Sequence, residues 1–331
     1  MVISREWHLL ARPRGWPKPE DFALVERDVP DPGDGEILVR NHYMSVDPYM
    51  RGRMNAQRTY AAPYEIGKAM YGEAVGEVVA SRSDRIAQGA FVRTMAGWRE
   101  AAVCRADTAE VIDPELAPLP AHLGVLGMPG WTAYVGLYDI GQPEPGETVF
   151  VSAASGAVGS IVGQLAKTHG CRVVGSVGSA AKVRYITEEL GFDAGCDYHD
   201  VDLTEWLGEA APDGVDIYFE NVGGDHLQAA LNAMNSFGRI VACGMISGYN
   251  EPRPGPSNLH SIVAKRLRVQ GFIVRDHADR KPAFLEHVGG MLRAGKIRHT
   301  ETVVDGIDNA VQALLQLLEG GHHTGKMVVS L

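Results

Sequence analysis

Residues 149–167 read VFVSAASGAVGSIVGQLAK, an apolar run that passes through a glycine-containing turn into a segment with helical periodicity. The turn nearly matches the phosphate-binding pattern G-x-G-x-x-G, with Gly156 and Gly159 in its second and third places. Ala154 holds the first place, where alanine is small enough if its φ angle stays negative. Gly163 follows one helical turn later, where a missing side chain lets a helix lie close to a sheet. The stretch predicts a strand, a tight turn and a helix from about residue 157 to residue 168.

Backbone N–H groups from Ala157 onward would face a pyrophosphate, because a helix N-terminus carries free N–H groups and the positive end of the helix dipole. The same sequence pattern also fits a glycine-rich turn that ends a buried strand and binds no ligand. The surrounding order of apolar strand, turn, helix and second strand favours the nucleotide-binding interpretation.

The segment at residues 175–182, GSVGSAAK, contains no acidic residue. Sites for NAD place an Asp or Glu about 20 residues after the turn, where it binds the ribose 2′-hydroxyl. Here Ser176, Ser179 and Lys182 stand instead. Hydroxyls and an ammonium group bind a 2′-phosphate, which a carboxylate would repel. The segment therefore favours NADP(H), although Lys182 alone would also suit a solvated helix start.

Strand and helix patterns alternate after the turn. Apolar runs at residues 171–177, 215–221 and 239–244 are separated by helical patterns near residues 180–190 and 225–234. Strands that alternate with crossover helices indicate a parallel, doubly wound sheet.

The first third of the chain has a different pattern. Short β-like runs alternate there with turns rich in Gly, Pro and Asp, which favours a barrel-like β unit. A helix over residues 307–318 and a strand in KMVVSL follow near the other end. Since 331 residues exceed one ordinary core, we expect two domains.

The charge balance is acidic, with 41 Asp and Glu against 31 Lys and Arg. Nucleic acids and anionic membranes need clustered basic residues, so we expect neither as a partner. No apolar segment has the length of a signal peptide or a membrane span, and we expect a cytoplasmic protein. The four cysteines form no C-x-x-C pair, so we assign them to neither a disulfide nor a zinc site.

Motifs for a catalytic metal or a hydrolase are missing from the sequence. No Cys with a nearby His-Glu pair stands in the first domain, and no G-x-S-x-G elbow occurs. A carbonyl group would then be polarised by hydrogen-bond donors. Tyr249 is favoured, because it follows the strand at residues 239–244 and open α/β sheets bind ligands beyond their strand ends. The other candidates, in segments expected to border the cleft, are Tyr49, Tyr60 and Tyr64.

Several longer stretches resemble one known family. They are SVDPYMRGRM, MPGWTAYVGL, AASGAVGSIVGQLAK, ELGFD, ENVGG and CGMISGYN. Together they resemble the zinc-independent medium-chain dehydrogenase/reductases, and within these the group of prostaglandin reductase (leukotriene B4 12-hydroxydehydrogenase), plant double-bond reductase and bacterial curcumin reductase. The resemblance covers essentially the whole chain. It implies a GroES-like β-barrel domain for substrate and catalysis at residues 1–122 and 300–331, and a Rossmann NADPH-binding domain at residues 123–299.

The resemblance also assigns cofactor contacts. The glycine turn would hold the pyrophosphate, Lys182 and Tyr198 would flank the 2′-phosphate, and Asn221 would line the nicotinamide half. His323 stands where the family often has an asparagine, and its imidazole could still donate a hydrogen bond. With Ser179, the expected NADPH-binding residues are Gly156, Ala157, Val158, Gly159, Ser179, Lys182, Tyr198, Asn221, Cys243, Gly244, Met245, Ile246, Ser247, Tyr249, Phe272, Ile273, Val274 and His323.

Reduction of an enone is the activity that the resemblance implies, that is, NADPH-dependent reduction of the C=C bond of α,β-unsaturated ketones and aldehydes. Hydride would reach the β-carbon, while a tyrosine hydroxyl and the cofactor's ribose hydroxyl would stabilise the enolate. We expect Tyr249 to position the carbonyl. The proton for the α-carbon would come from Tyr249, Tyr60 or water, and Tyr49 is a third catalytic candidate. A substrate pocket between the domains is expected to include Tyr49, Tyr60, Tyr64, Met128, Trp131 and Tyr249.

Two other functions remain open. A related zinc-free reductase could reduce quinones, and an NADPH-binding protein without catalytic activity could act as a sensor or a structural protein. The long family motifs favour enone reduction, and the cleft tyrosines favour an enzyme. We expect a small-molecule substrate, no metal and, from the family likeness, a homodimer.

Overall fold

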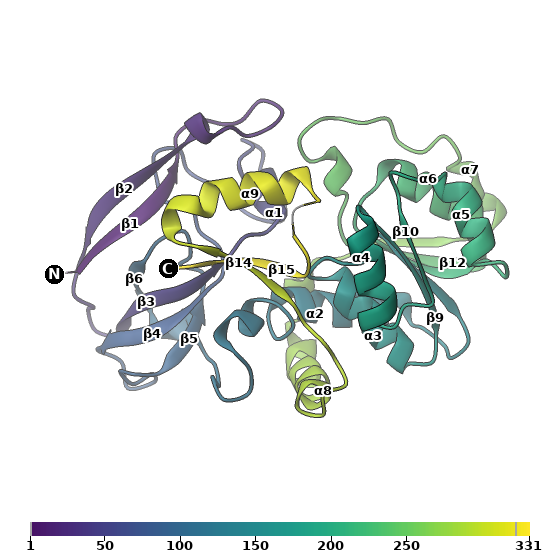
Figure 1. Cartoon of the computed structure of the whole chain (residues 1–331). Coiled ribbons are helices and arrows are strands. Elements are labelled where there is room, and N and C mark those ends of the chain that lie inside the picture. The colour runs from purple at the N-terminus through teal and green to yellow at the C-terminus, as the bar shows by residue number, and fades with distance from the viewer. Residues whose placement is uncertain (1, 322) are drawn as a thin grey trace. The chain divides into compact units, whose positions relative to one another are not determined.

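The computed structural model describes residues 2–321 and 323–331. The chain forms two compact units (Figure 1). The β unit is Met1–Gly124 with Glu301–Leu331, and the α/β unit is Val125–Thr300.

The α/β unit is built on one sheet of parallel strands, in the order β10-β9-β8-β11-β12-β13 within the described residues. The order reverses beside β8, which is typical of a doubly wound nucleotide-binding sheet. The expected doubly wound sheet is therefore confirmed. The strands are β8 Thr148–Val151, β9 Arg172–Val177, β10 Ala194–Asp197, β11 Val215–Glu220, β12 Met234–Ala242 and β13 Arg268–Gly271.

Helices connect these strands and pack on them. Helix α3 contacts β8 and β9, α4 contacts β9 and β10, and α6 contacts β11 and α5. Phe150 and Tyr218, on adjacent strands, stack with their ring centroids 4.8 Å apart, and Trp206 of α5 packs beside them. The helices are α2 Met128–Val135, α3 Gly159–Thr168, α4 Ala180–Arg184, α5 Leu203–Ala210, α6 Gly224–Ala233, α7 His260–Ala264 and α8 Lys281–Arg293.

Two expected helices differ in their bounds. The first begins at Gly159 rather than near residue 157, because the N–H of Gly156 closes a turn on the carbonyl of Ala153 before the helix starts. The second ends as an α-helix at Arg184 and continues as a wider π-helical turn over Tyr185–Glu189.

The β unit holds a mainly antiparallel sheet. Its order is β14-β15-β3-β4-β5-β7, with β6 paired to β3, and β1 and β2 form a separate ribbon. The strands are β1 Val2–Leu9, β2 Phe22–Val29, β3 Glu36–Ser45, β4 Ala74–Ser81, β5 Phe91–Thr94, β6 Ala101–Arg105, β7 Glu110–Val111, β14 Glu301–Asp305 and β15 Lys326–Ser330. The helices are α1 Tyr49–Arg53 and α9 Ala310–Glu319.

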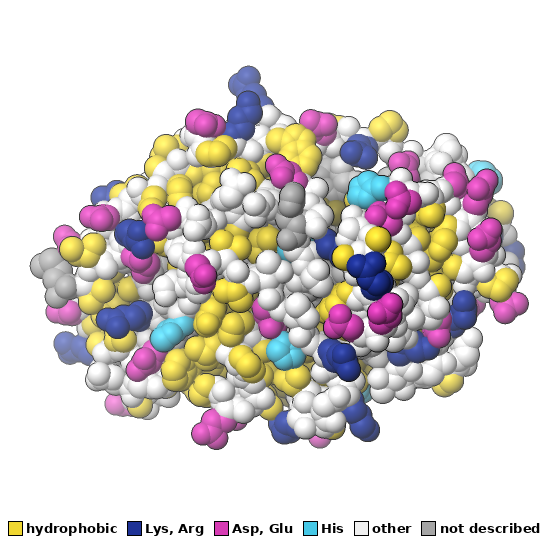
Figure 2. Space-filling model, viewed as in Figure 1, with side chains coloured by type: hydrophobic (Ala, Val, Ile, Leu, Met, Phe, Trp, Pro, Cys, Tyr) yellow, Lys and Arg dark blue, Asp and Glu magenta, His cyan; other side chains and the backbone are white. Residues whose placement is uncertain are grey.

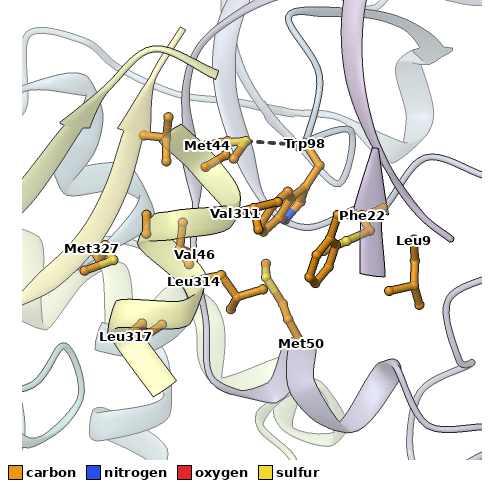
Figure 3. Packing of buried hydrophobic residues seen from close by; sticks show 14 of the residues in the cluster. Leu9, Phe22, Met44, Val46, Met50, Trp98, Val311, Leu314, Leu317 and Met327 are labelled. Carbon is orange, nitrogen blue, oxygen red and sulfur yellow. Dashed lines mark hydrogen bonds between the residues drawn. The ribbon is translucent and has the colours of Figure 1, made fainter. Parts of the chain in front are cut away.

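The core of the β unit joins segments that are far apart in the sequence (Figure 3). Helix α9 turns its apolar face toward this core, with Val311 and Leu314 lying near Trp98 and Met50. The backbone N–H of Trp98 donates to Sδ of Met44 at 3.1 Å. The apolar spacing predicted a helix over residues 307–318, and a 3-10 turn followed by α9 confirms it.

The surface carries charges of both signs. On the face shown in Figure 2, Lys and Arg side chains stand among acidic and polar ones, without a broad basic patch. Among the described residues, no helix combines the length and the apolar character needed to cross a membrane.

Candidate active site

The glycine turn lies between β8 and α3, beside the point where the strand order reverses. Among the described residues, Ala153 has a positive φ of 50°, whereas Ala154 is outside that left-handed region, as the sequence required. Gly175 of β9 makes room for the alanine, because a Cβ atom on Gly175 would lie 2.6 Å from the Cβ of Ala154. An alanine in the first place of the turn thus depends on a glycine in the next strand.

Gly159 and Gly163 each permit a close approach. A Cβ atom on Gly159 would lie 2.5 Å from the carbonyl oxygen of Ala153, and one on Gly163 would overlap the ring of Phe192. Residues 156–158 lead directly into α3, and the N–H groups of Ser160, Ile161 and Val162 donate to the carbonyls of Gly156 and Val158. The N–H groups of residues 157–159, just ahead of them, are therefore the ones that could face a ligand. This arrangement fits an anionic pyrophosphate.

Lys182 lies in α4 and is only 8% exposed. Burial lowers the pKa of the Lys182 ammonium, and the nearby charge of Asp197 opposes part of that shift. No hydrogen bond or ion pair of this ammonium is found in the part of the chain that the structure describes. A buried ammonium without a partner is costly unless an anion binds it, so Lys182 fits a phosphate ligand.

The other residues expected at the 2′-phosphate have different environments. Ser179 caps α4, and its hydroxyl accepts the N–H of Lys182 at 3.3 Å. Tyr198 lies beside Gly178, where a Cβ atom would come within 3.5 Å of the tyrosine hydroxyl. Ser176 is fully buried inside the unit, so it does not line a surface open to the phosphate.

An acidic residue at this edge was missed by the sequence interpretation. Asp197 ends β10, and its Oδ1 accepts hydrogen bonds from N and Nδ1 of His199 at 3.1 and 2.9 Å. The His199 ring packs against the Tyr198 ring at a tilt of 35°, with the centroids 4.1 Å apart. The segment GSVGSAAK is free of acids, but the next strand supplies one. The pairing of β9 with β10 was the signal that could have indicated it.

Loops meet beyond the carboxyl ends of β8, β11 and β12. Nδ2 of Asn221 donates to the carbonyl of Ser152 at 2.8 Å, and its backbone N–H donates to Oγ of Ser152 at 2.9 Å. The N–H groups of Cys243 and Gly244 both donate to the carbonyl of Glu220 at 3.0 Å. Asn221, Cys243 and Gly244 are thus brought together at the edge where open α/β sheets bind ligands.

The loop after β12 then folds back on β11. It passes through Met245 into a 3-10 turn, Ile246–Gly248, in which Oγ of Ser247 donates to the carbonyl of Val222 at 2.6 Å. The Tyr249 hydroxyl accepts the N–H of Met245 at 3.4 Å. These contacts place Tyr249 against the start of its own loop.

Two further groups complete the α/β unit's candidates. Burial raises the pKa of the Cys243 thiol to about 12, so it is a neutral lining group and not a nucleophile. Phe272 lies against Gly136, where a Cβ atom would come within 2.9 Å of its ring. Ile273 is half-buried and Val274 is buried.

Tyr49 opens α1 in the β unit. Its hydroxyl is buried and has no hydrogen-bond partner within residues 2–321 and 323–331. Burial, with a smaller effect of Asp47, raises the pKa of Tyr49 well above its ordinary value, so the hydroxyl keeps its proton. A Cβ atom on Gly72 would lie 3.6 Å from this hydroxyl and 3.7 Å from Nε1 of Trp98. The Tyr49 hydroxyl is therefore a buried hydrogen-bond donor that could donate to a bound ligand.

The remaining candidates of the β unit, Tyr64, Tyr60 and His323, differ in how far they are buried. Tyr64 is 1% exposed, its hydroxyl donates to the carbonyl of Tyr71 at 2.8 Å, and its ring faces the Arg53 guanidinium. Its hydroxyl therefore serves the unit's own core. Tyr60 is 62% exposed in the loop after α1. His323 is half-buried just before β15.

Met128 and Trp131 lie at the start of α2. Met128 is half-buried, and Trp131 is 8% exposed with Lys281 Nζ 5.6 Å from the centre of its ring. Nε1 of Trp131 is buried and finds no acceptor among the described residues.

Metal-ligating side chains do not gather in the described ranges, where no group of three or more His, Cys, Asp or Glu could hold an ion. The α/β unit offers its loop amide groups and the Tyr249 hydroxyl for hydrogen bonding, and the β unit offers the Tyr49 hydroxyl.

Comparisons with known proteins extend this description. A family model described as the N-terminal domain of oxidoreductase matches residues 5–112, and one described as zinc-binding dehydrogenase matches residues 157–288. The NADPH-dependent curcumin reductase of Escherichia coli strain K12 is 44% identical over 333 residues, which cover 98% of this chain and 96% of that protein. The NADP(+)-dependent 2-alkenal reductase of Nicotiana tabacum is 42% identical over 323 residues, with 95% and 94% covered.

A solved structure also resembles this chain over nearly its whole length. The crystal structure of CurA from Vibrio vulnificus in complex with NADPH has a TM-score of 0.93 and 41% sequence identity, and 98% of each chain is covered.

Proposed function

This chain belongs to the zinc-independent medium-chain dehydrogenase/reductases, and we propose that it reduces the C=C bond of α,β-unsaturated ketones and aldehydes with NADPH. The family resemblance of its motifs is confirmed. Relatives at 44% and 42% identity named curcumin reductase and 2-alkenal reductase support this activity and its cofactor.

The observation that carries the proposal in this chain is the Tyr49 hydroxyl. Buried polar groups are nearly always hydrogen-bonded, yet this hydroxyl has no acceptor in the described part of the chain. The carbonyl oxygen of an enone is such an acceptor. It becomes a better one during the reaction, because negative charge develops on it.

Residues of the chain would then act as follows. Bound NADPH supplies the hydride that the β-carbon of the enone accepts. The glycine turn and Lys182 bind the phosphates. Tyr49 donates its hydrogen bond to the carbonyl oxygen and lowers the energy of the enolate, and Tyr249 contributes positioning from the loop after β12. The α-carbon takes a proton from Tyr249, Tyr60 or water, and the exposed Tyr60 can regain a proton from solvent.

Turnover of a simple enone tests the activity. We expect NADPH absorbance to fall when enone is added, with NADH much less effective and the saturated carbonyl compound as product. A benzoquinone assayed in parallel tests the quinone alternative. Faster turnover of the quinone than of enones and enals, or no enone-dependent loss of NADPH, would reject the proposed function.

The roles of the two units belong to the same proposal. We assign NADPH binding to residues 123–299, and substrate binding and catalysis to residues 1–122 and 300–331. We also propose that the protein is cytoplasmic and, from the family likeness, that it forms a homodimer. Light scattering coupled to gel filtration tests the dimer, and a monomer mass at working concentrations would contradict it.

A further inference from the structure

Glu220 is the last residue of β11, and its side chain is fully buried. Its Oε1 accepts hydrogen bonds from the Tyr218 hydroxyl at 2.7 Å and from the N–H groups of Val222 and Gly223 at 2.7 and 2.8 Å. The Ser152 hydroxyl lies 3.3 Å from the same oxygen. One carboxyl oxygen thus gathers donors from its own strand, from the turn that follows, and from the end of β8.

The second oxygen, Oε2, is also buried and has no hydrogen-bond partner among the described residues. Burial raises the pKa of Glu220, while the hydrogen bonds to Oε1 oppose that shift. All the hydrogen-bond partners of the side chain found among the described residues are donors, and all of them donate to Oε1. An uncharged acceptor in the same place could satisfy those donors equally well.

The backbone of the same residue joins β11 to the loop after β12. The carbonyl of Glu220 accepts the N–H groups of Cys243 and Gly244, and the carbonyl of Val222 accepts both N–H and Oγ–H of Ser247. The side chain closes the turn that contains Val222, so it sets where that carbonyl points. Asn221, between them, is held on Ser152.

We propose that Glu220 is a positioning residue whose Oε1, acting as an acceptor and not as a charge, holds the 221–224 turn and the 243–249 loop in the form that binds the nicotinamide half of NADPH. This inference rests on the proposed function, because that function gives Asn221 and the loop their ligand. Glu220 itself touches no reacting atom.

Two substitutions separate acceptor from charge. Glu220→Gln keeps a carbonyl oxygen for the three donors, and Glu220→Leu removes the acceptor at similar volume. Binding of NADPH and of 2′,5′-ADP, which lacks the nicotinamide half, is measured by calorimetry. For Glu220→Leu we expect the Kd of NADPH to rise about tenfold or more, since buried N–H groups lose their acceptor, while the Kd of 2′,5′-ADP changes less than about twofold. Glu220→Gln should stay near wild type for both ligands.

The controls distinguish a positioning role from general loss of structure. Glu209→Leu, at an exposed position of α5, should leave both affinities unchanged. If Glu220→Leu fails to fold, Glu220→Asp replaces it, since a shorter side chain withdraws the acceptor. Equal weakening of both ligands, unchanged NADPH affinity, or Glu220→Gln behaving like Glu220→Leu would overturn the inference. Wild-type protein that binds 2′,5′-ADP but neither binds nor oxidises NADPH would instead contradict the proposed function.

Discussion

Nζ of Lys326 lies 3.1 Å from Oδ1 of Asp47, and both side chains are buried, with exposed fractions of 3% and 7%. The same ammonium donates to the backbone carbonyls of Val46 and Met327, and the hydroxyl of Ser45 donates to Oδ2 of Asp47. This pair ties the final strand of the chain to the turn that begins α1. Because one proline separates Asp47 from Tyr49, the pair also fixes the base of the candidate catalytic tyrosine.

Removing one partner of this pair should destabilise the β unit strongly. Lys326→Met leaves a buried carboxylate without its counter-charge, and we expect a loss of about 3–5 kcal/mol in the free energy of unfolding. Denaturant titration measures it. The double variant Lys326→Met/Asp47→Leu removes both charges and should recover part of the loss. If the double variant is less stable than the single one, the charge argument is wrong.

Tyr49 and Tyr64 offer a matched pair for testing which hydroxyl serves the reaction. For Tyr49→Phe we expect kcat for an enone to fall about 10²–10³-fold, as when one oxyanion donor is removed, with NADPH affinity unchanged. Tyr64→Phe removes a hydroxyl that is bonded to the Tyr71 carbonyl. It should cost about 0.5–1.5 kcal/mol of stability and little activity. Stopped-flow turnover and denaturant titration give the two readouts, and the reverse pattern would reassign the donor.

Gly163 can be tested through its contact with Phe192. A side chain at residue 163 would overlap that ring, so Gly163→Ala should cost about 1–3 kcal/mol through overpacking. Phe192→Leu in the same chain makes space and should restore part of the loss, which a double-mutant cycle of unfolding free energies measures. Strictly additive effects would show that the two residues do not compete for this space.

The nucleotide edge shows what a sequence pattern can and cannot predict. Alternating strands and helices follow from local periodicity, and so does the position of the glycine turn between β8 and α3. The reason that Ala154 is tolerated lies in Gly175, on another strand, and no spacing rule within the turn contains that information. The same holds for Asp197, which nears Lys182 only because β10 pairs with β9.

Buried polar groups were the other class that the sequence could not resolve. Glu220 and Lys326 are charged residues, and a charged residue type by itself suggests a surface group or a ligand-binding group. The role of Lys326 follows from a long-range partner, Asp47. Glu220 takes its hydrogen bonds from Tyr218, Val222 and Gly223, and only the fold brings Ser152 near it as well. The candidate tyrosines show the same limit. The Tyr64 hydroxyl donates to a backbone carbonyl and the Tyr49 hydroxyl has no acceptor in the described part of the chain, and the sequence does not distinguish the two.

We expect Lys182 to bind the 2′-phosphate. We also expect its buried charge to lower the stability of the protein when no cofactor is bound. Lys182→Met removes a buried ammonium that has no partner in the described part of the chain. We expect the Kd of NADPH to rise about tenfold or more, from the loss of a charge-assisted contact, while the Kd of NADH stays the same. Calorimetry with both nucleotides measures this. Equal loss for NADPH and NADH would mean that Lys182 acts elsewhere.

The free protein's stability then gives an independent test through pH. Burial lowers the pKa of Lys182 in the folded chain, so between that pKa and the ordinary lysine value the unfolded chain binds more protons. Stability from this group therefore rises with pH across that window. Without cofactor, Lys182→Met should be more stable than wild type at neutral pH, and the difference should shrink as pH approaches the ordinary lysine pKa. Lys167→Met is the control, because Lys167 already pairs with Asp193 at 2.9 Å and its removal should bring no such gain. A pH-independent difference for Lys182→Met would show that lost packing, and not the buried charge, governs this position.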